Sequence, residues 1–343
     1  MRAVVIHAAG DLRIDEVDDE PMNPGDVRVR IAAGGICGSD LHYFNHGGFG
    51  SVRLRAPMIL GHEIAGTVLE CGAAVTAVRP GQKVAINPSL PCQHCEYCLS
   101  GLQNHCLDMR FLGSAMRNPH VQGGFREILT CREAQAVPMP DHVPLEEAAF
   151  AEPLAVALHA VSRAGPILGK RVLITGSGPI GVLIAAAARR AGAVEIVMVD
   201  ILDAPLHCAR AAGADVTVNI SAEPDSLARY EENKGAFDIV FEASGSPSAV
   251  GFAFPVLRPC GILVCVGQGA EVTMQMSAIV TKEIQLRGAF RFHAAFSTAV
   301  AFIANGLVDV RHLLTSSVDV GDAIAAFKLA ADKNRSMKVQ LRF

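Results

Sequence analysis

Hydrophobic positions follow two different patterns along the chain, and the change falls near residue 148. In the first 145 residues the apolar residues form short alternating runs, as where Val27, Val29 and Ile31 alternate with charged or small residues. A period of two is typical of a strand with one buried face. Glycine pairs and prolines interrupt these runs, which indicates turns and loops. The first part of the chain is therefore predicted to be rich in short strands.

From residue 148 the pattern changes to helical runs and continuous apolar runs. A helix is predicted over 148–163, and buried strands are predicted over 171–175, 195–199, 216–219, 237–241 and 261–266. Alanine-rich segments between these strands have helical composition. Alternating strands and helices are the signature of a parallel, doubly wound α/β sheet.

After about residue 290 the alternation weakens, and residues 338–343 again look like a strand. We infer a nucleotide-binding type of domain inserted into a strand-rich domain that is built from both ends of the chain. The predicted boundaries are 1–147 together with 291–343 for the strand-rich domain, and 148–290 for the parallel-sheet domain. No repeat or low-complexity segment interrupts this organisation.

A glycine-rich loop follows the first buried strand of the parallel-sheet domain. It has the sequence Gly176-Ser-Gly178-Pro179-Ile180-Gly181 and leads into an apolar helix. Glycines at this spacing permit a tight turn, close approach of a pyrophosphate and packing of helix on strand, and the helix N-terminus attracts phosphate. Asp200 ends the next strand, where an acid bonds the ribose hydroxyls of NAD and repels the extra phosphate of NADP. An ordinary turn followed by a surface aspartate is the alternative.

Composition and charge exclude several partners. The chain has 343 residues and a net charge of −4 with no basic face, so neither nucleic acid nor an anionic membrane is an expected partner. Its first residues run directly into strand-like sequence, so we expect no leader peptide. The longest apolar stretch, 182–199, contains Arg189, Arg190 and Glu195, so we expect no membrane span. Ten cysteines in such a chain predict reduced thiols in the cytoplasm.

Four of these cysteines are close in sequence: Cys92, Cys95, Cys98 and Cys106. Four thiolates at such spacing are typical of a closed structural Zn²⁺ site, here in a lobe of about residues 88–108. Two disulfides or four unrelated core cysteines are the alternatives. A nucleic-acid-binding zinc protein is another, although the neighbouring residues are not basic.

A second set of possible metal ligands is scattered along the chain. Cys37, His62, Glu63 and Glu152 offer a thiol, an imidazole and two carboxylates. Together they are typical of a catalytic zinc site, which leaves a position for water or substrate. Each could instead be a core or surface residue, and spacing alone does not bring them together.

These motifs resemble those of zinc-dependent medium-chain dehydrogenases of the sorbitol dehydrogenase group. The resemblance covers essentially the whole chain and includes 34–43, 56–63, 85–89, 108–116 and 150–156. It implies a GroES-like catalytic domain beside a Rossmann domain, one catalytic and one structural Zn²⁺, and NAD as cofactor. It also implies oxidation of a secondary alcohol in a sugar acid or polyol, and a homodimer or homotetramer.

The resemblance also assigns roles to single residues. It implies that Cys37, His62 and Glu152 hold the catalytic zinc, with Glu63 as a direct or water-linked ligand. Ser39 and His42 match a proton relay, and Tyr43 and Arg291 match substrate or cofactor contacts. Further implied cofactor contacts are Val266, Gly267 and Phe290.

The substrate class depends on whether the site binds a carboxylate. A bidentate arginine is the natural partner of a carboxylate, and Arg291 and Arg110 are the candidates. A polyol dehydrogenase of the same family and a non-catalytic protein that binds NAD and zinc are the competing interpretations.

Overall fold

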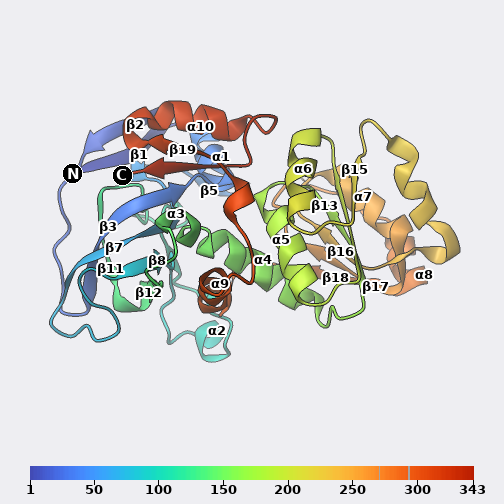
Figure 1. Cartoon of the computed structure of the whole chain (residues 1–343), viewed down its shortest axis with the longest axis horizontal. Coiled ribbons are helices and arrows are strands. Elements are labelled where there is room, and N and C mark those ends of the chain that lie inside the picture. The colour runs from blue at the N-terminus through green and yellow to red at the C-terminus, as the bar shows by residue number, and fades with distance from the viewer. Residues whose placement is uncertain (270, 293) are drawn as a thin grey trace.

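The chain forms two lobes, each built around its own β-sheet (Figure 1). The computed structural model describes residues 1–269, 271–292 and 294–343. Both termini lie in the lobe that contains the first strands, while the middle of the chain forms the other lobe.

The second lobe contains a six-stranded sheet in which every neighbouring pair is parallel. Its strand order is β15-β14-β13-β16-β17-β18, so the sheet grows outward in both directions from β13 and β16. This is the order of the Rossmann fold, and it confirms the predicted doubly wound sheet. The strands are β13 (Arg171–Thr175), β14 (Glu195–Asp200), β15 (Val216–Asn219), β16 (Phe237–Glu242), β17 (Leu257–Cys265) and β18 (Gln285–Gly288).

Helices cover both faces of this parallel sheet. Val172 and Ile174 pack into an apolar cluster with α4, α5, α6 and α9, whereas Leu173 packs on the other side with η3 and α7. Burial on both faces explains the continuous apolar runs of these strands. The bounds are α4 (Ala151–Ala164), α5 (Pro179–Arg190), α6 (Asp203–Ala211), η3 (Pro224–Tyr230), η4 (Glu232–Lys234), α7 (Pro247–Val256), α8 (Met276–Lys282) and α9 (Ala295–Ala304).

The helix predicted over 148–163 is present as α4, which begins three residues later than predicted. The short α3 (Leu145–Ala148) ends before α4 begins at Ala151. Pro153 lies in the first turn of α4, where its missing N–H is harmless. In a continuous helix the ring of Pro153 would collide with the carbonyl of Ala149. This collision explains why α3 and α4 are separate helices.

The first lobe contains a seven-stranded sheet of order β12-β8-β7-β3-β20-β19, with β11 also paired to β3. Strand β20 comes from the C-terminus and pairs antiparallel with β3, which places Gln340 opposite Gly35. The strand predicted at the C-terminus is thus present, and the domain boundaries themselves stay a prediction. The strands are β3 (Asp26–Gly35), β7 (Glu63–Cys71), β8 (Lys83–Ile86), β11 (Ile128–Arg132), β12 (Ala136–Pro138), β19 (Leu314–Asp319) and β20 (Lys338–Arg342).

Smaller elements complete the first lobe. A three-stranded sheet joins β1 (Arg2–Ala8), β2 (Asp11–Glu16) and β6 (Met58–Ile59), and a hairpin joins β4 (Gly48–Phe49) to β5 (Val52–Arg53). The remaining helices are α1 (Gly38–His46), α10 (Ala323–Ala331), η2 (Glu133–Gln135), η5 (Arg311–Leu313) and η6 (Val320–Asp322). Over the described ranges, no helix has both the length and the apolar character needed to cross a bilayer.

One further segment carries the clustered cysteines and is called the cysteine lobe here, residues 88–111. It contains β9 (Ser89–Leu90), α2 (Glu96–Leu99), η1 (Gln103–His105) and β10 (Arg110–Phe111). Its only strand pair is β9 with β10, and its small apolar cluster includes Cys98, Cys106, Met109 and Phe111. So little secondary structure needs another source of order, such as a bound metal.

Candidate active site

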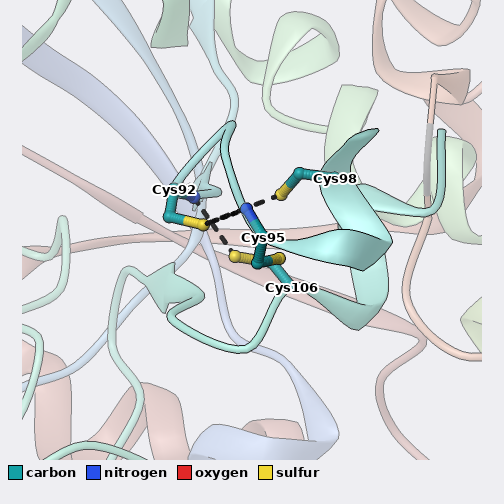
Figure 2. A group of neighbouring side chains, drawn as sticks. All are labelled: Cys92, Cys95, Cys98 and Cys106. Carbon is teal, nitrogen blue, oxygen red and sulfur yellow. Dashed lines mark hydrogen bonds between the residues drawn. The ribbon is translucent and has the colours of Figure 1, made fainter. Parts of the chain in front are cut away.

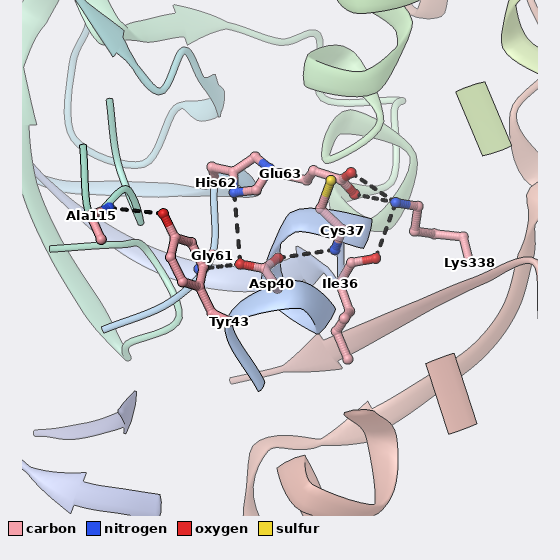
Figure 3. A network of polar contacts seen from close by, with 9 residues as sticks. All are labelled: Ile36, Cys37, Asp40, Tyr43, Gly61, His62, Glu63, Ala115 and Lys338. Atoms are coloured by element: carbon pink, nitrogen blue, oxygen red, sulfur yellow. Dashed lines mark hydrogen bonds and ion pairs between the residues drawn. The ribbon is translucent and has the colours of Figure 1, made fainter. Parts of the chain in front are cut away.

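The scattered ligand set is brought together at one end of the seven-stranded sheet (Figure 3). Cys37 follows β3 and caps α1, and His62 and Glu63 stand at the start of β7, which pairs with β3. Their possible ligand atoms all lie within 4.8 Å of one another. Pairing of β3 with β7 therefore brings Cys37 and His62 together, although they are 25 positions apart in the sequence. Their spacing alone did not predict this proximity.

Asp40 supports two of these three groups. Its carboxylate accepts a hydrogen bond from the N–H of Cys37 at 3.0 Å, across the first turn of α1. Its other oxygen accepts from the N–H of Gly61 at 3.3 Å and lies 3.8 Å from Nδ1 of His62. Asp40 is fully buried. Carboxylates behind a metal-binding histidine fix its orientation, and Asp40 is placed to do so for His62.

Glu63 is held by a buried ion pair with Lys338. The Lys338 ammonium donates to both carboxylate oxygens at 2.8 and 2.7 Å, and also to the carbonyl of Ile36 at 3.2 Å. Both side chains are at most 4% exposed. Lys338 starts β20, so the C-terminal strand brings this cation into the site. Sequence analysis missed Lys338, since nothing near it in sequence marks it as a partner of Glu63.

Glu152 lies on α4 at the edge of the same group. Its carboxylate does not belong to the set within 4.8 Å, but its side chain is buried and interacts electrostatically with His62, Glu63, Cys37 and Lys338. Burial raises the pKa of Glu152 to about 8, and burial with the nearby Glu63 raises the pKa of Cys37 to about 12. Three acidic groups that oppose one another's ionisation suit a bound dication, so the donor set fits Zn²⁺. The direct ligand among the two glutamates stays a prediction.

The four clustered cysteines form a second group (Figure 2). The sulfurs of Cys92, Cys95, Cys98 and Cys106 also lie within 4.8 Å of one another. Hydrogen bonds from the backbone N–H groups of Leu107 and Cys98 lower the pKa of Cys95 to about 6, and the N–H of Cys92 donates to the sulfur of Cys106 at 3.1 Å. These donors stabilise thiolates, which are the ligands of Zn²⁺. Four converging thiols fit a closed structural site.

The glycine-rich loop joins β13 to α5 as predicted, at the point where the sheet order reverses. Gly176 has φ +90°, and a side chain there would lie 2.9 Å from the backbone of Ser244, while one at Gly181 would collide with the carbonyl of Gly176. Open space lies beside Gly178, the first residue outside α5. Pro179 and Ile180 form the first turn of this helix. The loop therefore leaves its backbone accessible where a pyrophosphate would bind.

Asp200 is tied to the same loop. Its carboxylate accepts from the N–H of Ser177 at 2.7 Å and from those of Ile201 and Leu202 at 2.8 and 3.1 Å. At the end of β17, the N–H groups of Val266 and Gly267 both donate to the carbonyl of Glu242. These residues all lie at the carboxyl edge of the parallel sheet, where ligands of such folds bind.

Arg291 follows β18 and reaches toward the first lobe. Its guanidinium carbon lies 4.1 Å from the ring centre of Phe111 and 5.1 Å from that of Phe290. Among the described residues, its only hydrogen bond goes to the sulfur of Met116, a weak acceptor. Burial lowers the pKa of Arg291 to about 10, although Glu152 and Tyr43 oppose this shift. The guanidinium thus remains charged and has donors free for an anion.

Tyr43, Ser39 and His42 share helix α1. Tyr43 is buried, and its hydroxyl accepts from the N–H of Ala115 at 2.9 Å. Ser39 and His42 lie one turn apart, with Ser39 half-buried and His42 exposed, so the helix runs from the metal-ligand group toward solvent. They share no hydrogen bond in the described parts of the chain, and the relay stays a prediction. Arg110, the other candidate for a carboxylate, is exposed.

Two known domain families match the chain in the order that the structure shows. The alcohol dehydrogenase GroES-like domain matches residues 23–141, and the zinc-binding dehydrogenase family matches residues 179–305. The chain belongs to the zinc-binding alcohol dehydrogenase family and is a zinc-dependent, NAD(P)-linked dehydrogenase.

Individual relatives are similar over nearly the whole length. L-idonate 5-dehydrogenase (NAD(P)(+)) of Escherichia coli K-12 is 45% identical over 94% of this chain and 93% of its own. Sorbitol dehydrogenase of Gallus gallus is 34% identical over 99% and 96%. The crystal structure of Escherichia coli L-idonate 5-dehydrogenase matches with a TM-score of 0.96 and 43% identity, over 100% of this chain and 98% of that one. The expected fold class, GroES-like plus Rossmann, is confirmed.

Replacing Lys338 by Met should destabilise the protein strongly. The change leaves the Glu63 carboxylate buried without its partner, which costs about 3–5 kcal/mol in unfolding free energy measured by urea denaturation. Lys338→Arg, which keeps the cation, should lose much less. As a matched control, Arg13→Met breaks the exposed pair with Asp11 and should leave the free energy of unfolding almost unchanged. A change that small for Lys338→Met would show that Glu63 does not depend on Lys338.

Replacing Cys95 by Ser should remove one of two zinc ions per chain and lower the thermal midpoint. The hydroxyl cannot supply the fourth thiolate, so the cysteine lobe loses its metal while Cys37, His62 and Glu63 keep theirs. Zinc content by atomic emission and unfolding by calorimetry measure both effects. Cys260→Ser, at an exposed cysteine of the parallel-sheet lobe, is the control and should retain both ions. Two ions in Cys95→Ser would refute the assignment.

Proposed function

We propose that this enzyme oxidises the C5 secondary alcohol of L-idonate and transfers the hydride to NAD, giving 5-keto-D-gluconate, NADH and a proton. Similarity to L-idonate 5-dehydrogenase over 94% of the chain supports this substrate. The observation that carries the proposal is the free guanidinium of Arg291 beside the ligand group. An aldonate has a carboxylate to pair with it, whereas a sugar alcohol has none.

The position of Arg291 suits a carboxylate at the far end of the substrate from the reacting hydroxyl. The guanidinium is flanked by two aromatic rings, which leave its edge as the place for hydrogen bonds. Charge-assisted bidentate contacts fix orientation as well as adding affinity. The electrostatic effects of Glu152 and Tyr43 on Arg291 support its nearness to the catalytic group. Arg291 therefore orients the substrate so that one secondary hydroxyl faces Cys37 and His62.

Cys37, His62 and a glutamate, Glu63 or Glu152, would hold the catalytic zinc. A bound Zn²⁺ acidifies the substrate hydroxyl and stabilises negative charge on its oxygen. The Asp40 carboxylate lies 3.8 Å behind Nδ1 of His62, and the Lys338 ammonium keeps Glu63 in place. Ser39 receives the hydroxyl proton, and His42 passes it to solvent. The glycine-rich loop and Phe290 would hold the cofactor, which would supply the hydride acceptor.

NAD is the proposed cofactor in preference to NADP. The Asp200 carboxylate is fixed by three backbone N–H groups at the end of β14, and a 2′-phosphate would meet this negative charge. The following residues, Ile-Leu-Asp-Ala-Pro, offer no arginine to bind such a phosphate. Fixed negative charge thus favours a free ribose hydroxyl.

We place the enzyme in the cytoplasm as a homodimer or homotetramer. All ten cysteines are free in the structure, which suits a reducing compartment. Strand β18 ends the parallel sheet and is paired on one side within the chain, and its Leu286 is 43% exposed. An open strand edge with an exposed leucine supports pairing with a second copy.

The substrate assignment predicts a clear order of activities. Wild-type enzyme with NAD should turn over L-idonate with a higher kcat/KM than sorbitol or L-iditol, and NADP should be the poorer cofactor. Arg291→Gln should lower kcat/KM for L-idonate by about 10- to 100-fold and for sorbitol by less than about threefold, because only the aldonate loses a charged contact. NADH absorbance measures each rate, and a zinc chelator should abolish it. A wild-type preference for the uncharged polyol would favour a sorbitol- or xylitol-type enzyme instead.

The relay predicts a change in pH dependence when His42 is replaced by Gln. Burial lowers the pKa of His42, so its imidazole is neutral and able to accept a proton at neutral pH. Glutamine cannot accept it, so kcat should fall by about tenfold at acidic and neutral pH and recover at alkaline pH, where hydroxide takes the proton. His207→Gln, at an exposed histidine of α6 in the other lobe, is the control. A kcat profile unchanged by His42→Gln would exclude the relay.

A further inference from the structure

We propose that Asn104 of the cysteine lobe is a positioning residue for Arg291, so that the structural-zinc segment sets the geometry of the substrate site. Asn104 does not reach the ligand group itself. It acts through the backbone of Phe290, the residue before Arg291. The proposal rests on the proposed function only in taking Arg291 as a substrate contact.

The contact crosses from the cysteine lobe to the end of the parallel sheet. The side-chain amide of Asn104 donates to the carbonyl of Phe290 at 3.1 Å, although the two residues are 186 positions apart. Asn104 is only 6% exposed, and this is its one side-chain hydrogen bond to the described chain. Beside it, the ring of His105 stacks on the ring of Phe290, with centroids 6.1 Å apart and an interplanar angle of 29°. Asn104 and His105, which are adjacent in η1, therefore both contact Phe290.

The backbone conformation of Arg291 explains why these contacts to Phe290 affect the arginine side chain. Arg291 has φ +53°, the left-handed region that a non-glycine residue enters only at a cost in free energy. The Phe290 carbonyl belongs to the same peptide plane as the Arg291 N–H. A hydrogen bond to that carbonyl fixes the plane, and with it the direction in which the arginine side chain leaves the backbone. Without Asn104, the peptide is free to relax toward the ordinary φ region.

The cysteine lobe also supplies the surface on which the guanidinium rests. Phe111 lies 4.1 Å from the guanidinium carbon of Arg291 and, at 5.5 Å between ring centroids, also contacts His62. The same ring packs in one apolar cluster with Cys98, Cys106 and Met109. The lobe thus holds Arg291 at both ends, at the guanidinium through Phe111 and at the backbone through Asn104 and His105.

A double-mutant cycle tests this coupling. Asn104→Leu keeps the branched shape of the side chain and removes the donor, and it is made in the wild-type and in the Arg291→Gln background. Positioning predicts that it lowers kcat/KM for L-idonate by about tenfold in the first background, mainly through KM, and by less than about twofold in the second. The affinity of L-idonate for the enzyme–NADH complex, measured by NADH fluorescence, should fall by the same factor. Zinc content should stay at the wild-type value.

Control variants separate positioning from loss of structure. His105→Ala, at an exposed residue, should give a smaller loss of the same kind and serves if Asn104→Leu does not fold. Leu99→Ala, on the exposed surface of the same lobe, should change nothing. Equal losses in both backgrounds, or no loss in either, would overturn the proposal. If the wild-type enzyme oxidises sorbitol and not L-idonate, the proposed substrate fails, and the role of Arg291 on which this proposal rests fails with it. Additive losses in an enzyme that does oxidise L-idonate overturn the positioning role of Asn104 alone.

Discussion

The buried contact between the Lys338 ammonium and the Glu63 carboxylate is the interaction on which the rest of the site depends. Cys37, Glu63 and Glu152 are acidic groups held in a poorly solvated space, where burial and the nearby Glu63 raise the pKa values of Cys37 and Glu152. Lys338 is the buried cation that offsets this charge. Its three hydrogen bonds also satisfy the ammonium, so its burial leaves no donor unpaired.

The position of Lys338 explains why the chain must return to its first lobe. Strand β20 lies between β3 and β19, and β3 in turn pairs with β7, which starts at Glu63. Cation and carboxylate are therefore fixed by adjacent strands of one sheet. A ligand group built on paired strands is held rigidly.

The two cysteine-containing centres stabilise negative charge by different means. In the cysteine lobe, backbone N–H groups face the sulfurs and lower the pKa of Cys95 to about 6, although burial raises the pKa of Cys98 to about 12. Around Cys37, burial and a neighbouring carboxylate raise the thiol pKa, and the compensation comes from the Lys338 ammonium. The first arrangement suits four thiolates that enclose a metal. The second suits a mixed donor set that leaves a position open to substrate.

The features that could be predicted from the sequence are those that depend on interactions within one short segment. The loop from Gly176 to Gly181 and the four cysteines depend on spacing within one turn or loop, and both are present as expected. Asp40 was within a recognised motif, but its role depends on Cys37 being the cap of α1, which only the structure shows. Lys338 binds Glu63, which is 275 positions away, and Asn104 binds Phe290, which is 186 positions away. The pattern of hydrophobic residues does not reveal pairs so distant in sequence. The positive φ of Arg291 was equally hidden, since no glycine marks it.

Segment 288–291 links substrate binding to cofactor binding in the proposed reaction. Phe290 is the predicted cofactor contact and Arg291 the proposed carboxylate contact, and the two share one peptide plane. A cofactor that displaces Phe290 must therefore also move the Arg291 guanidinium between its aromatic neighbours. Asn104 and His105 hold the peptide between Phe290 and Arg291 from the cysteine lobe. The cysteine lobe therefore resists a displacement of Phe290. In the proposed reaction, substrate orientation thus depends on the cysteine lobe and on the segment after β18, which meet at Phe290 and Arg291.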